Sequence, residues 1–461
     1  MSNGVAKVVQ STDRLPRFWQ RDVIFFANLL GLFFGNDSEA KVLSDEIGEV
    51  DSYGGRLMPI LNLLFRDGEN LLYLERTPDA ALCDYFANRL SLSLPRYEVI
   101  SHSDYQEIGQ TLEAGRHADV DQLLPSTATG PQEWVDGYVT DDTLQQLAEH
   151  LGKQTISTTH GSRRGNNKLL LHQFVRDQGL PHLDTELAAS TADLAGCVKR
   201  LAAKGYAAAV VKSQIGASGI GIMKIADIQS APALPDLPTH MFYEGPCMVQ
   251  GWSQPGARGV TAVRSPSVQM FLDDTTVYLY DTTEQILSRD SVHEGNLSPV
   301  PYADQCAGLL PEMLRQAGVV GQWLHAQGYR GTASTDFLVI DRDGSAQSEV
   351  HVCEVNARVT GATYPSVLAP HFQPSGAWLM RNLRLAEPMS GGELLDVLAG
   401  ADHLYRPQRD TGVLPVNFNC GADGLVHKGQ FLLLAATPKD CEAYLSRIND
   451  ELPIKWTADR D

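Results

Sequence analysis

Four polar residues in the last third of the chain have a spacing that could do chemistry together: Asp336, Glu354, Asn356 and Arg358. They lie within residues 328–365, a stretch with the pattern of two strands joined by a polar turn. The strands are expected over about residues 334–340 and 349–358, with turn-forming residues at 341–345. The stretch therefore predicts a β-hairpin that carries two carboxylates.

The two-residue period of a strand predicts how these side chains face each other. On this period, one face of the first strand and one face of the second each carry a carboxylate. These faces comprise Asp336, Leu338 and Ile340, and Val350, Val352, Glu354, Asn356 and Arg358. A hairpin centred on Ser345 sets Asp336 opposite Glu354, with Cβ atoms about 5 Å apart.

Two opposed carboxylates repel, and a hard cation between them removes that cost. Mg²⁺ prefers oxygen ligands and often binds one or two carboxylates together with substrate phosphates. Asn356 adds a neutral oxygen, and Arg358 adds a fixed positive charge. The pattern is equally consistent with an ordinary hairpin whose polar face is solvated.

Composition limits the class of protein. The chain has 461 residues, 43% of them hydrophobic, and a formal net charge of −19. This length supports two to four domains' worth of core. The negative charge argues against nucleic acid or an anionic membrane as a partner, because both need a basic surface.

The cysteines and the N-terminus indicate a cytoplasmic protein. The seven cysteines are odd in number, widely spaced and lack a CxxC motif, which favours reduced, mostly buried thiols. We find no signal-peptide pattern at the start of the sequence. The most apolar run, residues 23–34, is interrupted by Asn28 and Gly31 and is too short to span a bilayer.

Residues 1–150 alternate short apolar runs with polar turns, as in a small α/β domain. Strands are expected over residues 23–30, 58–65, 71–74 and 97–100, and a helix over 79–90. The largely polar stretch 119–137, which contains Pro125 and Pro131, predicts a surface connection.

Two helices follow. Asn166 or Asn167 can cap a helix that runs to Gln178, with Lys168 in its first turn. His160, Arg163 and Arg164 lie near Lys168 and form a basic cluster, which is also typical of a solvated loop. The second helix begins at the capping-box pattern of residues 190–193 and ends at Gly205.

A glycine-rich loop lies between two expected strands at residues 208–212 and 220–225. Glycines such as Gly216 and Gly219 allow backbone N–H groups to approach a phosphate, and Lys212 at the strand end could hold a phosphate oxygen. The segment is not a Walker A loop, in which the lysine follows the glycines. A plain hairpin with a glycine turn explains the pattern equally well.

The remaining elements are expected as follows. Strands are predicted over residues 247–252, 270–272, 277–280, 413–418 and 430–435. Helices are predicted over 309–327, 378–385 and 391–398, and from Thr437, where an N-cap is followed by Pro438.

The order of these features resembles the ATP-grasp superfamily over about residues 150–390. The features are Lys168, Lys212 with its glycine loop, the strand end Gln250–Trp252, then Asp336 and Glu354-x-Asn356-x-Arg358. The resemblance implies a mixed α/β (α+β) fold with an N-terminal pre-ATP-grasp domain over residues 1–150. It implies a small lobe with the glycine loop over 151–245, and a large lobe with the metal site and a C-terminal subdomain over 246–461.

The resemblance also implies roles for individual residues. Nucleotide phosphates would contact Lys168, Lys212 and the loop residues Gly216, Ser218, Gly219 and Gly221. Adenine would meet the hinge at Gln250, Gly251 and Trp252, where many members have an acidic residue in place of Gln250. Asp336, Glu354 and Asn356 would bind Mg²⁺, with Mn²⁺ as an alternative ion. Arg358 would face the transferred phosphate.

Within the superfamily, the chain resembles amino-acid and peptide ligases of bacterial natural-product pathways, of the pheganomycin and tabtoxin type. This narrower likeness lies in RSPSVQ at 264–269, TEQIL at 283–287, the pair Gly295-Asn296 and GYRGTASTDF at 328–337. It implies ATP-dependent amide formation through an acyl phosphate. Arg264 and residues 360–365 could hold the carboxylate substrate, although Arg264 could instead pair with a buried acid.

Three alternatives to an amino-acid or peptide ligase stay open at this point. The acceptor could be something other than an amino acid, the chain could be a non-catalytic ATP-binding regulatory module, or it could be a kinase. The partners expected are small-molecule amino acids or peptides. The oligomeric state does not follow from the sequence, and a homodimer is one candidate.

Overall fold

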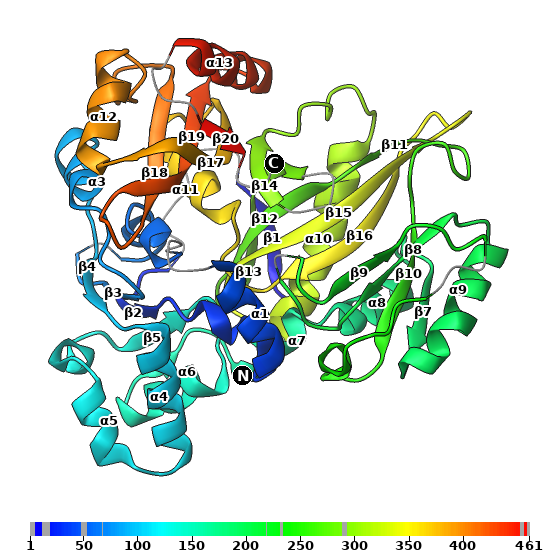
Figure 1. Ribbon diagram of the computed structural model, residues 1–461, viewed down its shortest axis with the longest axis horizontal. Coiled ribbons are helices and arrows are strands. Elements are labelled where there is room, and N and C mark those ends of the chain that lie inside the picture. Colours follow the sequence, from blue (N-terminus) through cyan, green and yellow to red (C-terminus); the bar gives the residue numbers. More distant parts are fainter. Residues whose placement is uncertain are drawn as a thin grey trace.

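The computed structural model describes residues 5–11, 19–47, 53–66, 68–217, 219–230, 234–287, 293–451 and 456–458. The strands in these residues form three sheets of eleven, four and five strands. Figure 1 shows the five-stranded sheet and its helices beside the large sheet, with the four-stranded sheet at the opposite edge.

The N-terminal sheet is parallel, in the order β4-β3-β2-β5-β6. Its strands are β2 (Val23–Phe26), β3 (Leu71–Leu74), β4 (Arg96–Val99), β5 (Trp134–Gly137) and β6 (Gln154–Thr155). Val23 and Phe25 belong to one hydrophobic core and Ile24 and Phe26 to another. The central strand β2 is thus buried on both faces, as is usual for parallel sheets.

Helices cover this sheet, and the structure of this part of the chain differs from two predictions. They are α1 (Asp37–Ile47), α3 (Ala80–Asp84), which continues as a π-helical turn to Arg89, α4 (His102–Glu113), α5 (His117–Leu123) and α6 (Asp142–His150). The strand expected at 58–65 is wrong, because the segment forms a turn and the short helix α2 (Leu61–Leu64). Leu57, Leu61 and Leu64 are buried at helical spacing, which an unbroken apolar run hides. The stretch 119–137 also contains β5 as well as connecting turns.

The four-stranded sheet has the order β7-β10-β8-β9, with antiparallel pairs. Its strands are β7 (Thr185–Ala188), β8 (Ala208–Lys212), β9 (Ile222–Ile225) and β10 (Cys247–Trp252). The helix α9 (Leu194–Ala203) begins next to the predicted Ser190–Asp193 capping box and buries Leu194, Cys197, Val198 and Leu201 against the sheet. This lobe therefore has a core of its own.

The large sheet has the strand order β11-β15-β12-β13-β14-β17-β19-β18. Three further strands pair beside this path: β16, β1 (Lys7–Gln10) and β20 (Trp456–Ala458). Its principal strands are β11 (Val260–Arg264), β12 (Pro266–Leu272), β13 (Thr276–Leu287), β14 (His293–Ser298), β15 (Gly331–Arg342), β16 (Glu349–Asn356), β17 (Ala377–Met389), β18 (Gly412–Cys420) and β19 (Val426–Ala435). Its accompanying helices are α7 (Thr159–Gly165), α8 (Lys168–Asp177), α10 (Leu309–Ala326), α11 (Thr363–Phe372), α12 (Gly391–Gly400) and α13 (Pro438–Glu451).

One predicted helix is a strand. Residues 378–385 lie in β17, where Leu383 and Leu385 are buried and Arg384 between them is exposed. That alternation is the strand period. The preceding run, residues 377–380, is buried throughout and therefore carries no period that could distinguish strand from helix.

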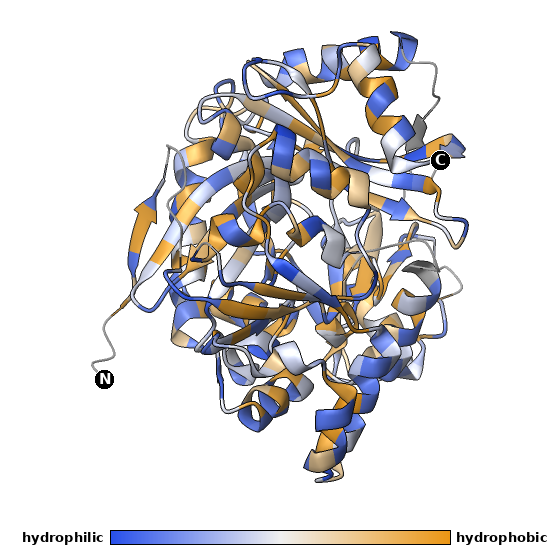
Figure 2. Cartoon of the chain, turned by 90° about the vertical axis from the view of Figure 1, so that its left-hand side faces the viewer, coloured by the Kyte–Doolittle hydropathy of each residue, from blue (hydrophilic) through white to orange (hydrophobic). Residues whose placement is uncertain are grey.

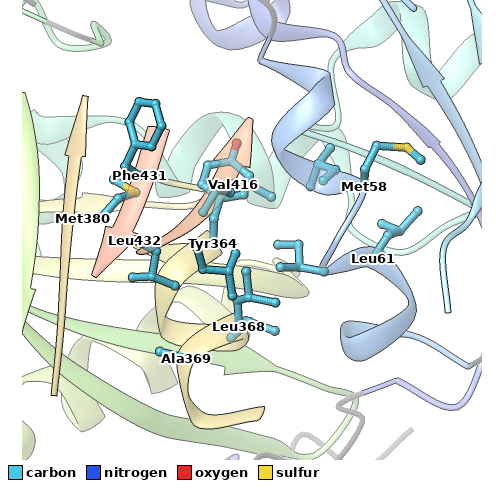
Figure 3. Packing of buried hydrophobic residues seen from close by; sticks show 14 of the residues in the cluster. Met58, Leu61, Tyr364, Leu368, Ala369, Met380, Val416, Phe431 and Leu432 are labelled. Carbon is cyan, nitrogen blue, oxygen red and sulfur yellow. The ribbon is translucent and has the colours of Figure 1, made fainter. Parts of the chain in front are cut away.

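The N-terminal domain and the C-terminal part share one hydrophobic core. Figure 3 shows Met58 and Leu61 facing Tyr364 and Leu368 of α11, with Leu432 of β19 alongside. Figure 2 shows strands in the interior that are largely hydrophobic and peripheral helices with mixed faces. The N-terminal domain is thus held firmly against the large sheet.

Sheet membership differs from the predicted domain ranges in two places. The strand β1 (Lys7–Gln10) runs parallel to β13 in the large sheet. The strand β10 (Cys247–Trp252) belongs to the small sheet, beyond the predicted boundary at residue 245. The seven cysteines form no disulfide, and three of them are buried. No helix in the described ranges is long and apolar enough to cross a bilayer.

Candidate active site

The β15–β16 hairpin places its two carboxylates as predicted. Asp336 is the ladder partner of Glu354, and Ser334 is the partner of Asn356. Nearer the turn, however, Ile340 pairs with Glu349, so an unbroken ladder would set Asp336 against Cys353. A β-bulge between Phe337 and Asp336 absorbs this extra residue and restores the Asp336–Glu354 pair.

The bulge corrects one part of the sequence analysis. Val350 and Val352 were expected on the same face as Glu354 and Asn356. Instead they are packed in the core beneath α10 together with Val355. Because the bulge inserts one residue at Cys353, the strand face changes there, and only Glu354 and Asn356 line the cavity.

Short side chains surround Asp336. The hydroxyl of Ser267 donates to Oδ1 at 2.7 Å, and that of Ser334 donates to the same oxygen at 3.2 Å. Asn356 donates Nδ2 to Asp336 Oδ2 at 2.9 Å. Burial, together with the facing charge of Glu354, nevertheless raises the pKa of Asp336 to about 6.

The pKa of Glu354 moves in the opposite direction, because cations surround its carboxylate. Lys168 Nζ lies 3.0 Å from Glu354 Oε1. Burial acts to raise the pKa of Glu354, but the charges of Lys168 and Arg358 outweigh it and hold this pKa below its usual value. The pKa of one carboxyl group of the hairpin is thus raised and that of the other is lowered.

This donor set fits a hard divalent cation. Two carboxylates with one amide oxygen are the protein ligands that Mg²⁺ uses when substrate phosphates complete its shell. The hydrogen bond from Asn356 uses its nitrogen, so its oxygen is the atom that would bind a metal. Among the described residues, no group of three His, Cys, Asp or Glu side chains forms a metal site that would compete.

Lys168 begins the helix α8 (Lys168–Asp177), whose N-cap is Asn167. Its ammonium group also donates to the carbonyl oxygen of Gly216 at 3.0 Å, and the side chain is 5% exposed. Lys168 therefore ties the glycine loop to the carboxylate hairpin. Its predicted basic neighbours do not join it: Arg163 pairs with Glu244 and Arg164 bonds Gln327.

Arg358 follows β16 and lines the same cavity. Its guanidinium donates to Asn166 Oδ1 at 2.6 Å, which fixes its direction. Asn166 lies between α8 and the preceding helix α7 (Thr159–Gly165) and also bonds the carbonyl of Ala357. Burial lowers the pKa of Arg358 from its high ordinary value.

The glycine loop connects β8 to β9. Gly216 and Gly219 line the cavity, and Lys212 Nζ at the end of β8 lies 3.8 Å from Cys353 Sγ, beside Glu354. Gly221 has a φ of +75°, and a Cβ there would lie 1.9 Å from Ser213 Oγ, so this position requires glycine. Ser218, also predicted to contact ATP, lies outside the described residues.

The expected hinge residues lie in the small sheet and do not line this cavity. Gln250 is buried, and its side-chain amide donates to Thr185 Oγ1 at 3.0 Å. Gly251 packs directly on the ring of Tyr206, and the Trp252 ring lies 4.6 Å from Lys224 Nζ. Any contact from Gln250 to a nucleotide would therefore come from its backbone.

Arg264 is placed differently from the prediction. It forms an ion pair with Asp341 at 2.6 Å and lies over the ring of Tyr302. It is not among the described residues that line the cavity. Its position at the end of β11, opposite Val339 rather than the carboxylates, explains the difference. The alternative reading of Arg264, pairing with an acid, is the one that the structure supports.

The cavity has a volume of about 450 Å³ and lies between all three parts of the chain. Several lining residues come from motifs that the sequence singled out, namely Ser267, Gln269, Gln285, Leu287, Asn296, Thr360 and Tyr364. Others were missed: Tyr53, Arg56 and Tyr138 of the N-terminal domain, and Asn382, Arg384, Lys428 and Gln430 of β17 and β19. The missed residues lack a local motif, because only the packing of distant segments brings them to the cavity.

Comparison with known proteins supports the resemblance. No protein-family model matches the sequence. The chain is 25% identical over 299 residues to the butirosin acyl-carrier protein–L-glutamate ligase of Niallia circulans. This match covers 64% of the chain and 62% of that ligase, so less than two thirds of the relative's length is represented.

Solved structures of low sequence identity share the fold. L-amino acid ligase from Bacillus licheniformis aligns over 96% of this chain and 99% of its own, with a TM-score of 0.51 and 13% identity. Biotin carboxylase from Campylobacter jejuni aligns over 95% of this chain and 92% of its own, with a TM-score of 0.55 and 12% identity. N5-carboxyaminoimidazole synthetase from Staphylococcus aureus, solved with ADP, aligns over 95% of this chain and 99% of its own. Its TM-score is 0.51 and its sequence identity is 12%.

Proposed function

We propose that this chain, which has the ATP-grasp fold expected from its sequence, is an ATP-dependent carboxylate–amine ligase. It would join the carboxylate of an amino acid or peptide to an amine and release ADP and phosphate. One observation carries the proposal: Asp336 and Glu354 face each other in a cavity that Lys168, Arg358 and the glycine loop also line.

The first step would activate the carboxylate. A carboxylate is a poor acylating agent, and attack of its oxygen on the γ-phosphorus of ATP gives an acyl phosphate and ADP. Lys168, Lys212 and the N–H groups of the glycine loop would hold the phosphoryl oxygens, and Arg358 would stabilise charge on the transferred group. Asp336, Glu354 and Asn356 would hold Mg²⁺ or Mn²⁺, which neutralises phosphate charge when bound.

The second step would form the amide. The amine attacks the acyl carbon, the C–N bond forms, the bond to the phosphate oxygen breaks, and the amine loses a proton. Positioning supplies much of such a rate, and the loop tied to Lys168 would exclude the water that hydrolyses an acyl phosphate. The backbone of Gln250–Trp252 is the proposed adenine contact. We assign no catalytic role to Arg264, because its charge is paired with Asp341.

The substrate class rests on the relatives. The curated relative is named as a ligase of L-glutamate, and one solved neighbour as an L-amino acid ligase, which supports an amino acid as one substrate. We place the reaction in natural-product biosynthesis on the narrower sequence likeness. The name of the curated relative also favours a second candidate, in which the other substrate is attached to a carrier protein.

The test mixes the purified protein with ATP, Mg²⁺ and a pool of amino acids and dipeptides. Phosphate release is measured, and mass spectrometry searches for masses equal to two components minus water. Phosphate with a condensed product supports the ligase and identifies its substrates. ADP with a phosphorylated small molecule and no condensation would instead indicate a kinase.

A further inference from the structure

His293, the first residue of β14, is the one histidine among the described residues that line the cavity. Its half-buried ring packs on Gly361, where an added Cβ would lie 3.0 Å from Cε1 of the ring. Gly361 follows Arg358 by three residues, and the residues between them also line the cavity. Because three residues span at most about 11 Å, the imidazole lies in the same part of the cavity as Arg358.

A β-bulge turns the side chain of His293 into the cavity. Ile286 of β13 pairs with Gly295 of β14. The next residue of β13, Leu287, pairs with His293, so β14 has one extra residue at this point. In an unbroken strand, residues three apart point to opposite faces. The bulge instead brings His293 to the face of Asn296, and both side chains line the cavity.

Asn296 determines which ring nitrogen of His293 carries the proton. Nε2 of the ring lies 2.6 Å from Asn296 Oδ1. An amide oxygen only accepts hydrogen bonds, so Nε2 is the donor and carries the proton of the neutral ring. Nδ1 then has the lone pair, and no described residue forms a hydrogen bond with it. The ring therefore presents a proton acceptor to the cavity.

The surroundings of His293 favour its neutral form. Burial lowers the pKa of His293 below its ordinary value, and the charge of Arg56 acts in the same direction. The neighbouring acid in the chain, Glu294, is paired with Arg381. An imidazole that is neutral at neutral pH can act as a base.

The other titratable side chains that line the cavity are poor candidates for a base. Asp336 and Glu354 are the proposed metal ligands. Lysine, arginine and tyrosine side chains hold their protons at neutral pH, and burial raises the pKa of Tyr364 to about 12. Among the described lining residues, this leaves His293.

We propose that Nδ1 of His293 accepts the proton that the attacking amine loses, and that Asn296 positions the ring for this transfer. The amine nitrogen bonds the acyl carbon, the bond from that carbon to the phosphate oxygen breaks, and an N–H proton moves from the amine to Nδ1. The imidazolium then releases the proton to water. This role rests on the proposed ligase function and belongs to its second step. It places the amine substrate between Arg358 and His293.

The test separates the two steps in the full-length protein. With ATP, Mg²⁺ and the pool of amino acids and dipeptides, mass spectrometry measures amide formation. Excess hydroxylamine measures acyl phosphate formation as hydroxamate, because it attacks acyl phosphates without help from a base on the protein. His293→Gln and His293→Ala are compared with the exposed control His117→Gln. Thermal melting shows that each variant is folded.

We expect His293→Gln to lower the rate of amide formation by roughly 100-fold or more, as loss of a general base predicts, and to leave hydroxamate formation close to that of wild type. His117→Gln should match wild type in both. Added imidazole should restore amide formation in His293→Ala, where the ring leaves a space, but not in His293→Gln. A residue that only supports the fold would show neither the split between the steps nor the rescue.

Asn296→Asp tests the positioning role. A carboxylate facing Nε2 raises the pKa of the imidazole, so the acidic limb of the pH profile for amide formation should move to higher pH than in wild type. Equal loss of hydroxamate and amide in His293→Gln, no rescue by imidazole, or an unmoved acidic limb would overturn the role of His293 and leave the ligase standing. Wild type that forms neither hydroxamate nor amide would refute the ligase itself.

Discussion

Asp336 and Glu354 face each other across one ladder, yet the pKa values of their carboxyl groups move in opposite directions. Burial and the charge of Glu354 raise the pKa of Asp336 to about 6, whereas Lys168 and Arg358 lower that of Glu354. Asp336 therefore holds a proton only below about pH 6, while Glu354 stays ionised there. A divalent cation would ionise both, which is the state that the proposed reaction needs.

Glu354→Gln is expected to cost far more activity than nucleotide binding. The substitution keeps the size of the side chain but removes the charge that would hold the metal and that meets Lys168 at 3.0 Å. The measurements are phosphate release and nucleotide affinity. The matched control, Glu349→Gln, lies on the same strand in an ion pair with Arg342 outside the cavity. Near-normal turnover in Glu354→Gln would remove the metal assignment.

Lys168→Gln is expected to loosen the glycine loop and to weaken ATP binding by roughly tenfold or more. The ammonium group bridges the carbonyl of Gly216 and the carboxylate of Glu354, and a neutral amide cannot replace both bonds. Hydrogen exchange should increase over residues 213–221, and ATP titration gives the affinity. Lys199→Gln, at an exposed site on α9, serves as the control. Unchanged exchange in the loop would show that Lys168 does not hold it.

Leu368→Ala is expected to destabilise the protein by about 2–5 kcal/mol, because it leaves a cavity in the core shared by the N-terminal domain and α11. Leu368 is fully buried and lies near Leu61 in Figure 3. Urea unfolding measures the free energy. Leu187→Ala, at a site that is 45% exposed, should change it little. Equal effects of the two substitutions would contradict the shared core.

Asp136→Asn is expected to stabilise the protein at pH 8 but not at about pH 4. Burial raises the pKa of Asp136 on β5 to about 7. The unfolded chain releases this proton near its ordinary value of 3.8, so the folded state binds more protons between about pH 4 and 7 and loses stability as pH rises through that range. The asparagine variant avoids this loss, which is at most about 4 kcal/mol.

Thermal melting of wild type and Asp136→Asn from about pH 4 to about pH 8 measures the difference. The two melting temperatures should coincide near pH 4, separate as the pH rises to about 7 and stay apart above it, with the variant higher. Asp304→Asn, at an exposed position, is the control and should follow wild type. A gap that does not change with pH would mean that Asp136 does not titrate as described.

The sequence predicted the carboxylate pair correctly although it could not show the bulge. Counting from Ser345 gave Asp336 opposite Glu354, whereas the turn is closed by the pair Ile340–Glu349, one residue out of that register. The insertion at Cys353 compensates for the difference. Strand period alone places Val350 on the same face as Glu354, so the face of the valines was predicted wrongly.

Local signals sufficed where a segment carries its own chemistry. The capping box at Ser190 and Asp193 and the cap of α8 at Asn167 follow from side chains that bond the nearby backbone. Local sequence signals did not predict the secondary structure correctly where the chain is buried on all sides, as in β17. An all-apolar run has no period that could distinguish a strand from a helix. The cationic pair Arg384–Lys428 joins residues far apart in sequence, and no local pattern could reveal it.

The most direct test of the proposed ligase is trapping of the acyl phosphate. The protein is incubated with ATP, Mg²⁺, the pool of amino acids and peptides, and hydroxylamine, which converts an acyl phosphate into a stable hydroxamate. Mass spectrometry identifies the hydroxamate, and chromatography identifies the nucleotide. The structure predicts a hydroxamate with ADP and phosphate, which Glu354→Gln abolishes and Glu349→Gln retains. A hydroxamate with AMP and pyrophosphate, or ADP without any hydroxamate, would contradict an acyl phosphate formed at this site.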